Sequence, residues 1–164
     1  MRILLTGGSS FTGFWFASSL RSAGFEVVAV LQRAPAKYEG LRGERVQELA
    51  KVARIVPDCA FGSAAFLEIV SAERFDVLCH HAARVTDYRS PRFDIVTALA
   101  ENTNNIQAVL EAMLANGLKF IVVTGSVFEA NEGVGSWPMR AFKGITADCF
   151  AIGACICVSP LGNS

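Results

Sequence analysis

The sequence predicts a single α/β domain over residues 1–164, built on a doubly wound parallel sheet of about six strands with helices on both faces. Short apolar runs alternate with helical stretches along the chain, which is typical of βαβ units. A glycine-rich turn follows the first apolar run directly. A length of 164 residues, with 52% hydrophobic and 18% charged residues, suits one domain with a sizeable core.

Apolar runs place the expected strands near residues 2–6, 26–31, 52–56, 76–80, 119–124 and 155–159. Between the first two we expect a helix over residues 12–23, because Gly24 suits the left-handed cap that ends a helix. Residues 33–51 are polar and contain one proline and two glycines, so we expect a loop with a short helix there.

A second helix is predicted over residues 93–115. Its apolar side chains recur every three to four residues and are expected to face the sheet: Ile95, Leu99, Ile106, Leu110 and Met113. Asn102 falls on the same stripe. A buried amide costs about 1–3 kcal/mol if it is unpaired, so we expect backbone groups, water or a neighbouring site residue to hold Asn102. Alternatively, the amide only ties the helix to a strand.

The turn after the first strand favours a phosphate-bearing cofactor. Gly7 and Gly8 are expected to form a tight turn with positive φ, and Gly13 to let the following helix pack close to the strand. The amino terminus of that helix then directs free N–H groups at a pyrophosphate. Ser10 stands where a middle glycine brings the backbone close to the phosphate. The alternative is an ordinary strand-to-helix turn.

The charge balance argues against two classes of partner. Fifteen basic and fifteen acidic residues cancel, so we expect neither nucleic acid nor an acidic membrane surface. A strand begins after only Met1 and Arg2, and no apolar run approaches the roughly 18 residues of a membrane span. We therefore expect a cytoplasmic protein.

The five cysteines form no CxxC pair, and their odd number leaves at least one unpaired, so reduced and mostly packed thiols are expected. Cys155 and Cys157 with His80 and His81 lack the spacing of zinc ligands, and no metal site is predicted. Of the two histidines at the strand end, we expect one to be packed and the other to be hydrogen-bonded locally.

Ligands of open parallel sheets bind beyond the carboxyl ends of the strands. In this chain those positions hold the glycine-rich turn, Arg33, Asp58, residues 81–84 and Ser126. Together they outline a dinucleotide groove.

Four motifs resemble the extended short-chain dehydrogenase/reductases, specifically the NAD-dependent epimerase/dehydratase family, whose members often act on nucleotide sugars. TGGSSFTGFWFA is similar to the family's TGxxGxxG turn, and DVLCHHAA at 76–83 to its DVVxHxAA segment. ENTNNIQAVLEAM at 101–113 resembles the NVxGTxNLLEAA helix, and KFIVVTGSVFE at 119–129 the strand that ends in the catalytic Ser/Thr. The resemblance implies a Rossmann-like fold and covers the amino-terminal part of a family member, so we expect the substrate domain to be absent.

The resemblance also implies roles for individual residues. Gly7, Ser10 and Gly13 cradle the pyrophosphate, within a turn that also contains Gly8, Phe11 and Thr12. Asp58 approaches the adenine, Ala82 and Ala83 line the nicotinamide side, and Asn102 belongs to the same site. Members that prefer NAD carry an acid after the second strand, whereas this chain has Gln32 and Arg33. A guanidinium there pairs with a 2′-phosphate, so we expect NADP in preference to NAD; a solvated surface arginine is the alternative.

The family's catalytic YxxxK dyad is incomplete. The chain has two tyrosines, Tyr38 and Tyr88, and neither has a lysine four residues later. The resemblance leaves Ser126 to orient a substrate oxygen and Lys143 as the surviving lysine of the dyad. The leading interpretation is an NAD(P)-binding domain of an epimerase/dehydratase-like oxidoreductase, with a sugar nucleotide as the expected substrate class and a homodimer as the expected assembly. The alternative is a non-catalytic dinucleotide-binding sensor or interaction module.

Overall fold

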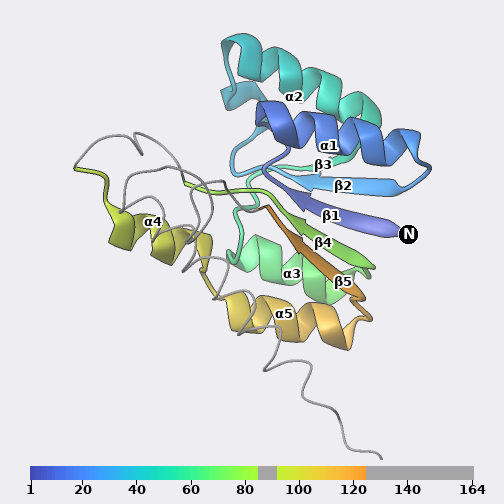
Figure 1. The fold of residues 1–164 in the computed structure, drawn as a ribbon, viewed down its shortest axis with the longest axis vertical. Helices are drawn as coiled ribbons and strands as arrows, with labels where there is room; N and C mark the ends of the chain where they lie inside the picture. The colour runs from blue at the N-terminus through green and yellow to red at the C-terminus, as the bar shows by residue number, and fades with distance from the viewer. Residues whose placement is uncertain (85–91, 125–164) are drawn as a thin grey trace, which may run out of the picture.

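The computed structural model describes residues 1–84 and 92–124, which form a parallel sheet covered by helices (Figure 1). The strand order is β3-β2-β1-β4-β5, and every pairing is parallel. The strands are β1 (Arg2–Thr6), β2 (Glu26–Val30), β3 (Arg54–Val56), β4 (Val77–His80) and β5 (Phe120–Val123). The order reverses between β1 and β4, which is the topological switch point where sheets of this kind bind ligands.

Helices cover both faces of the sheet, as the sequence predicts. α1 (Phe11–Ser22) and α2 (Gly40–Val52) lie on one face, and α3 (Ala64–Ala72) and α5 (Ile106–Ala115) on the other (Figure 1). A short 3₁₀ helix, η1 (Pro35–Lys37), precedes α2. α4 (Ile95–Asn102) lies beyond the carboxyl ends of the strands rather than over a face.

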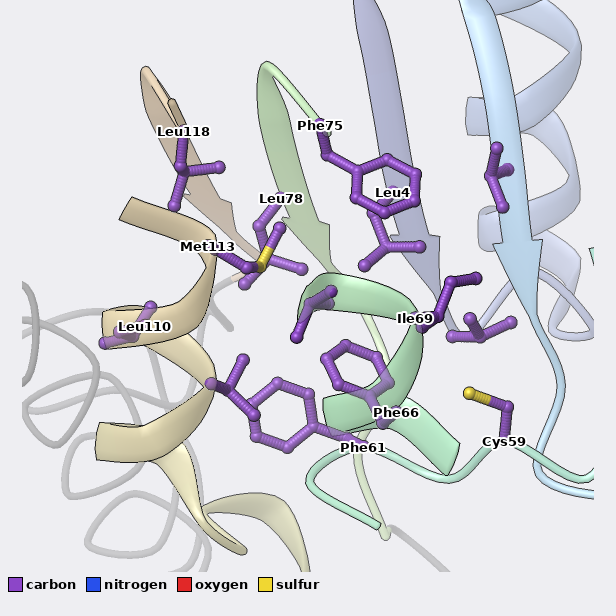
Figure 2. Close-up of a cluster of buried hydrophobic side chains, with 14 residues drawn as sticks. Leu4, Cys59, Phe61, Phe66, Ile69, Phe75, Leu78, Leu110, Met113 and Leu118 are labelled. Atoms are coloured by element: carbon purple, nitrogen blue, oxygen red, sulfur yellow. The ribbon is translucent and has the colours of Figure 1, made fainter. Parts of the chain in front are cut away.

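The larger hydrophobic cluster lies between the sheet and the α3/α5 layer (Figure 2). Phe66 of α3 and Leu110 of α5 are fully buried there against Leu4 and Leu78 of the central strands. A second cluster, including Leu5, Ala29 and Leu49, fills the space under α1 and α2. Both faces of β1 and β4 are therefore buried, which explains their continuous apolar runs.

The predicted strands are confirmed within one or two residues over the described part, and the predicted strand at 155–159 lies outside it. The expected loop with a short helix over 33–51 is wrong, because a 13-residue helix, α2, occupies most of it. The loop was expected because Gly40 and Gly43 are residues that disfavour a helix interior. Gly43 is instead buried, and a β-carbon there would overlap the carbonyl oxygen of Tyr38, so the glycine lets α2 pack closely.

The single helix expected over 93–115 is also wrong, because the chain breaks between α4 and α5. Asn105 takes the left-handed conformation with φ of 49°, and its side-chain Nδ2 donates to the carbonyl oxygen of Gly62 at 2.8 Å. The apolar stripe consequently divides. Leu110 and Met113 pack on the sheet as expected, whereas Ile95 and Leu99 join a small separate cluster around Ala98 and Phe93.

Candidate functional site

The glycine-rich turn lies at the switch point, in direct contact with the segment that follows β4. Gly7 has φ of 75°, and a β-carbon on it would lie 2.7 Å from the backbone nitrogen of Ala82. Only glycine tolerates both conditions. The carboxyl ends of β1 and β4 therefore meet backbone to backbone.

The rest of the turn fixes the start of α1. Ser10 is the N-cap, and its Oγ accepts a hydrogen bond from the Gly13 N–H at 3.0 Å. A β-carbon on Gly13 would overlap the Gly7 carbonyl oxygen, so the helix touches the turn as predicted. The positive φ expected at Gly8 is wrong. Gly8 is required for space instead, because a β-carbon there would lie 3.0 Å from Leu49 Cδ2.

Phe11 and Thr12 are exposed at the first turn of α1. Backbone N–H groups of a first helical turn have no intrahelical acceptor, so this end of α1 presents donors and a partial positive charge. Phe11 exposes 67% of its surface. The turn is thus an anion-binding geometry with its donors directed outward.

Thr6, the last residue of β1, organises the segment after β4. Its Oγ1 accepts hydrogen bonds from the backbone N–H groups of His81 at 3.1 Å and Ala82 at 2.9 Å. It also lies 3.1 Å from Nδ1 of His80. Because Thr6 already accepts twice, its hydroxyl hydrogen is left to donate to the imidazole. His80 is buried, as predicted for one of the two histidines.

His81 is half-buried and hydrogen-bonded locally, as predicted for the other. Its Nε2 lies 3.1 Å from Ser10 Oγ, and its Nδ1 lies 3.0 Å from Thr124 Oγ1. The ring of Phe16 packs edge-on against it at 5.1 Å between centroids. A single imidazole therefore joins the N-cap of α1 to the residue that follows β5.

Arginines from α2 reach the same turn from the other side. Arg42 donates to Ser9 Oγ from Nη2 at 2.8 Å, and Arg45 donates to the Ser9 carbonyl oxygen at 3.0 Å. Neither residue is among the predicted ligands, because the sequence predicts a loop with a short helix over residues 33–51. Their spacing of three residues places them on one face of a helix once α2 is recognised.

Arg33 lies at the end of β2 beside Tyr38, with its guanidinium carbon 4.8 Å from the ring centroid. Arg42 lies 5.3 Å from the same centroid, and the Tyr38 side chain is buried. Asp58 is exposed after β3, where its Oδ1 accepts from the Ala34 N–H at 2.9 Å. Asp58 thus ties together the loops after β2 and β3, near the place that the resemblance gives the adenine.

Asn102, the last residue of α4, anchors the segment that follows β4. Only 5% of it is exposed, and its Oδ1 accepts from the Arg84 N–H at 2.9 Å. The expected backbone anchor is therefore confirmed. The buried Nδ2 has no hydrogen-bond partner within the described ranges. Ala83 lies half-buried in the segment that Asn102 anchors.

Ser126 and Lys143, the two predicted catalytic residues, lie outside the described residues. Cys59 and Cys79 are buried free thiols, in line with the expected packing, and burial raises the pKa of Cys59 to about 11. Over residues 1–84 and 92–124, no three His, Cys, Asp or Glu side chains gather as metal ligands do. No helix in those ranges has the length and apolar content needed to cross a bilayer.

The model of the NAD dependent epimerase/dehydratase family matches residues 3–138. This chain belongs to that family. Its fold is similar to the UDP-glucose 4-epimerase of Thermotoga maritima, with 20% identity and a TM-score of 0.70 over 94% of this chain and 51% of the epimerase. It also resembles Gre2 of Candida albicans solved with NADPH, with 15% identity and a TM-score of 0.59 over 100% of this chain and 54% of Gre2.

A third similar structure is a short-chain dehydrogenase/reductase from Burkholderia multivorans with bound NADP, at 20% identity and a TM-score of 0.64, over 90% of this chain and 69% of that one. No curated protein matches the chain. The epimerase and Gre2 are each about twice as long as the part that this chain spans. The family and the Rossmann-like fold predicted from the sequence are confirmed.

Proposed function

We propose that this chain binds a nicotinamide dinucleotide, with a preference for NADP, as the cofactor domain of an epimerase/dehydratase-type oxidoreductase. The observation that carries the proposal is the close approach of Gly7 to Ala82 and of Gly13 to Gly7. These contacts leave the backbone N–H groups of Phe11 and Thr12 open toward a pyrophosphate. The unpartnered Nδ2 of Asn102 supports a bound group on the nicotinamide side.

The preference for NADP rests on two arginines near Tyr38: Arg33, which follows β2, and Arg42 of α2. Neither forms an ion pair with any described carboxylate. Guanidinium groups without an acidic partner are well suited to a phosphate. Arg42 donates to Ser9 Oγ from both Nε and Nη2, and this contact reduces the entropy lost when the arginine binds an anion.

When bound, the nicotinamide supplies hydride transfer. The chain's own contribution is binding and orientation: the turn holds the pyrophosphate, Arg33 and Arg42 hold the 2′-phosphate, and Asn102 donates from Nδ2. By family resemblance, Ser126 orients a substrate oxygen and Lys143 contacts the ribose. A sugar nucleotide is the proposed substrate class, in keeping with the UDP-glucose 4-epimerases among the similar structures.

A second candidate is a non-catalytic dinucleotide-binding module. The observation that favours it is the place of Tyr38, which is buried beside Arg33 and Arg42 and is thus committed to packing. Of the two tyrosines, Tyr88 lies outside the described residues. The two candidates separate on turnover: an enzyme interconverts UDP-sugars or reduces NADP with a sugar nucleotide, whereas a module only binds the cofactor.

The cofactor preference is tested with Arg33→Ala and Arg42→Ala in the full chain. Each loses a charged contact worth about 1.5–3 kcal/mol, so the Kd for NADPH is expected to rise at least tenfold. The Kd for NADH is expected to change little. Arg21→Ala, at the far end of α1, is the matched control. Equal loss of NADH and NADPH binding in the two variants contradicts the assignment of a 2′-phosphate site.

A further inference from the structure

We propose that His81 is a residue of the phosphate subsite, and that its imidazole takes up a proton when the pyrophosphate binds, so that dinucleotide affinity rises as the pH falls. This inference rests on the proposed function and adds proton uptake to dinucleotide binding. In the motif DVVxHxAA, His80 occupies the family's histidine and His81 falls on a variable position.

The position of His81 is the first argument. Its ring bridges Ser10, the N-cap of α1, and Thr124, the residue after β5. The backbone N–H of His81 is fixed by Thr6, so the imidazole is held at the switch point from three sides. A group at the N-cap of the phosphate-binding helix is close to any anion that the turn holds.

The partners of the ring are the second argument. Ser10 and Thr124 offer hydroxyls, which accept hydrogen bonds as readily as they donate them. Both ring nitrogens of a protonated His81 therefore have acceptors in place. Neutral imidazole is also accommodated, because a hydroxyl can donate to the ring nitrogen that carries no hydrogen.

Ser10 converts this protonation into phosphate binding. Its Oγ already accepts from the Gly13 N–H. When Nε2 of His81 also donates to Oγ, the oxygen has accepted twice, and the hydroxyl hydrogen is left to donate to a third group. A phosphate oxygen at the turn is the acceptor that fits. Protonation thus adds one cation and, relative to the neutral tautomer that accepts at Nε2, frees one hydroxyl donor for the anion.

The surrounding charges determine the direction of the coupling. Arg42 and Arg45 reach Ser9 from α2, and the N-terminus of α1 adds a partial positive charge. Among the described residues, His80 at the end of β4 is the adjacent titratable group, and Arg84 forms an ion pair with Glu101 of α4. The positive groups on the turn oppose a further cation while the turn is empty. A doubly negative pyrophosphate reverses that balance and favours the imidazolium.

ADP-ribose is the probe for the test, because it carries the pyrophosphate without the 2′-phosphate. A 2′-phosphate titrates at about pH 6 and would mask the effect of His81. We expect the full chain to bind ADP-ribose about tenfold more tightly at about pH 5.5 than at about pH 8.5, which corresponds to an upward shift of one unit in the titration midpoint of His81. With two histidines in the chain, NMR follows that midpoint directly, and His81→Gln assigns it.

His81→Gln keeps a hydrogen-bonding side chain and removes the charge, so its affinity for ADP-ribose is expected to be independent of pH. Calorimetry of the unmodified chain in two buffers of different ionisation enthalpy gives the proton uptake even where the variant fails to fold. Binding without pH dependence, proton uptake or a shifted midpoint overturns the role of His81 and leaves the dinucleotide site standing. A folded chain that does not bind ADP-ribose at either pH overturns the proposed function, and this inference with it.

Discussion

The glycines of the phosphate turn serve different physical purposes although they look alike in the sequence. Gly7 needs a positive φ, Gly8 needs space beside Leu49, and Gly13 lets α1 touch the end of β1. The glycine-rich motif predicts small residues in this turn, because a helix can approach a strand this closely only where the side chains are small. Which constraint applies at each position depends on neighbours that are distant in sequence, such as Leu49, and the sequence alone does not reveal it.

Gly13→Ala is expected to destabilise the chain by about 1–3 kcal/mol, because the new β-carbon overlaps the Gly7 carbonyl oxygen and forces α1 away from the turn. Dinucleotide binding is expected to weaken with it. Urea denaturation measures the loss. Gly24→Ala is the comparison: its β-carbon meets open space, and only the strain of a left-handed residue remains, at about 1–2 kcal/mol. Full NADPH affinity in Gly13→Ala would show that the close contact is unnecessary.

The arginines illustrate what sequence analysis misses at the level of single residues. Arg33 follows a strand and was therefore predicted as a phosphate ligand, whereas Arg42 and Arg45 were hidden in a segment interpreted as a loop. Their contact with Ser9 depends on the packing of α2 against the turn. Ser126 and Lys143 remain predictions.

At the level of elements, the strands were predicted well because buried parallel strands read as continuous apolar runs. The helices were harder to predict. Gly43 allows α2 to pack on Tyr38 and does not end it, and the apolar stripe over 95–113 continues across a break. Periodicity records which side chains are apolar, but it does not show that Asn105 turns the chain to meet Gly62.

Substitutions at Asn105 test the break between α4 and α5. Asn105→Gly keeps the left-handed backbone and loses the hydrogen bond to Gly62, so it is expected to cost about 0.5–1.5 kcal/mol. Asn105→Ala loses the bond and also strains the backbone, adding about 1–2 kcal/mol. Thermal unfolding of the two variants side by side gives the difference. A more stable Asn105→Ala than Asn105→Gly would mean that the junction is helical in solution, because alanine is favoured over glycine in a helix by about 1 kcal/mol.

At the level of the whole molecule, charges collect at the amino-terminal edge of the sheet, away from the proposed site. Asp76 accepts from the Arg2 N–H and pairs with Lys119 at 2.8 Å, so β1 and the start of β5 are tied to the start of β4. Arg2 also pairs with Glu26 at 2.7 Å and with Glu73 at 2.5 Å. The ion pairs at the amino-terminal edge therefore contribute to stability, whereas the proposed binding site lies at the opposite edge.

This edge predicts how stability depends on pH. The hydrogen bonds from Lys119 and from the Arg2 backbone lower the pKa of Asp76 to about 2. A carboxyl whose pKa is lower in the folded state than in the unfolded state stabilises the fold at pH values above its unfolded pKa of about 4. That contribution is lost as the pH falls toward 2. Asp76→Asn is thus expected to be less stable than the unmodified chain at pH 7, with the difference shrinking between about pH 4 and pH 2.

Denaturant midpoints over that pH range measure the effect, with the exposed Glu44→Gln as the charge-matched control. A difference between Asp76→Asn and the unmodified chain that stays constant from neutral to acid pH would exclude a titrating Asp76. The homodimer and the cytoplasmic location remain predictions at this scale.

Titration of the full chain with NADPH and with NADH, followed by nicotinamide fluorescence and thermal shift together, tests the central claim most directly. Saturable binding of both, with NADPH bound at least tenfold more tightly, is the predicted result and corresponds to about 1.4 kcal/mol or more from the 2′-phosphate. A chain shown to be folded by its circular dichroism, yet with neither fluorescence change nor stabilisation by either cofactor, would contradict it.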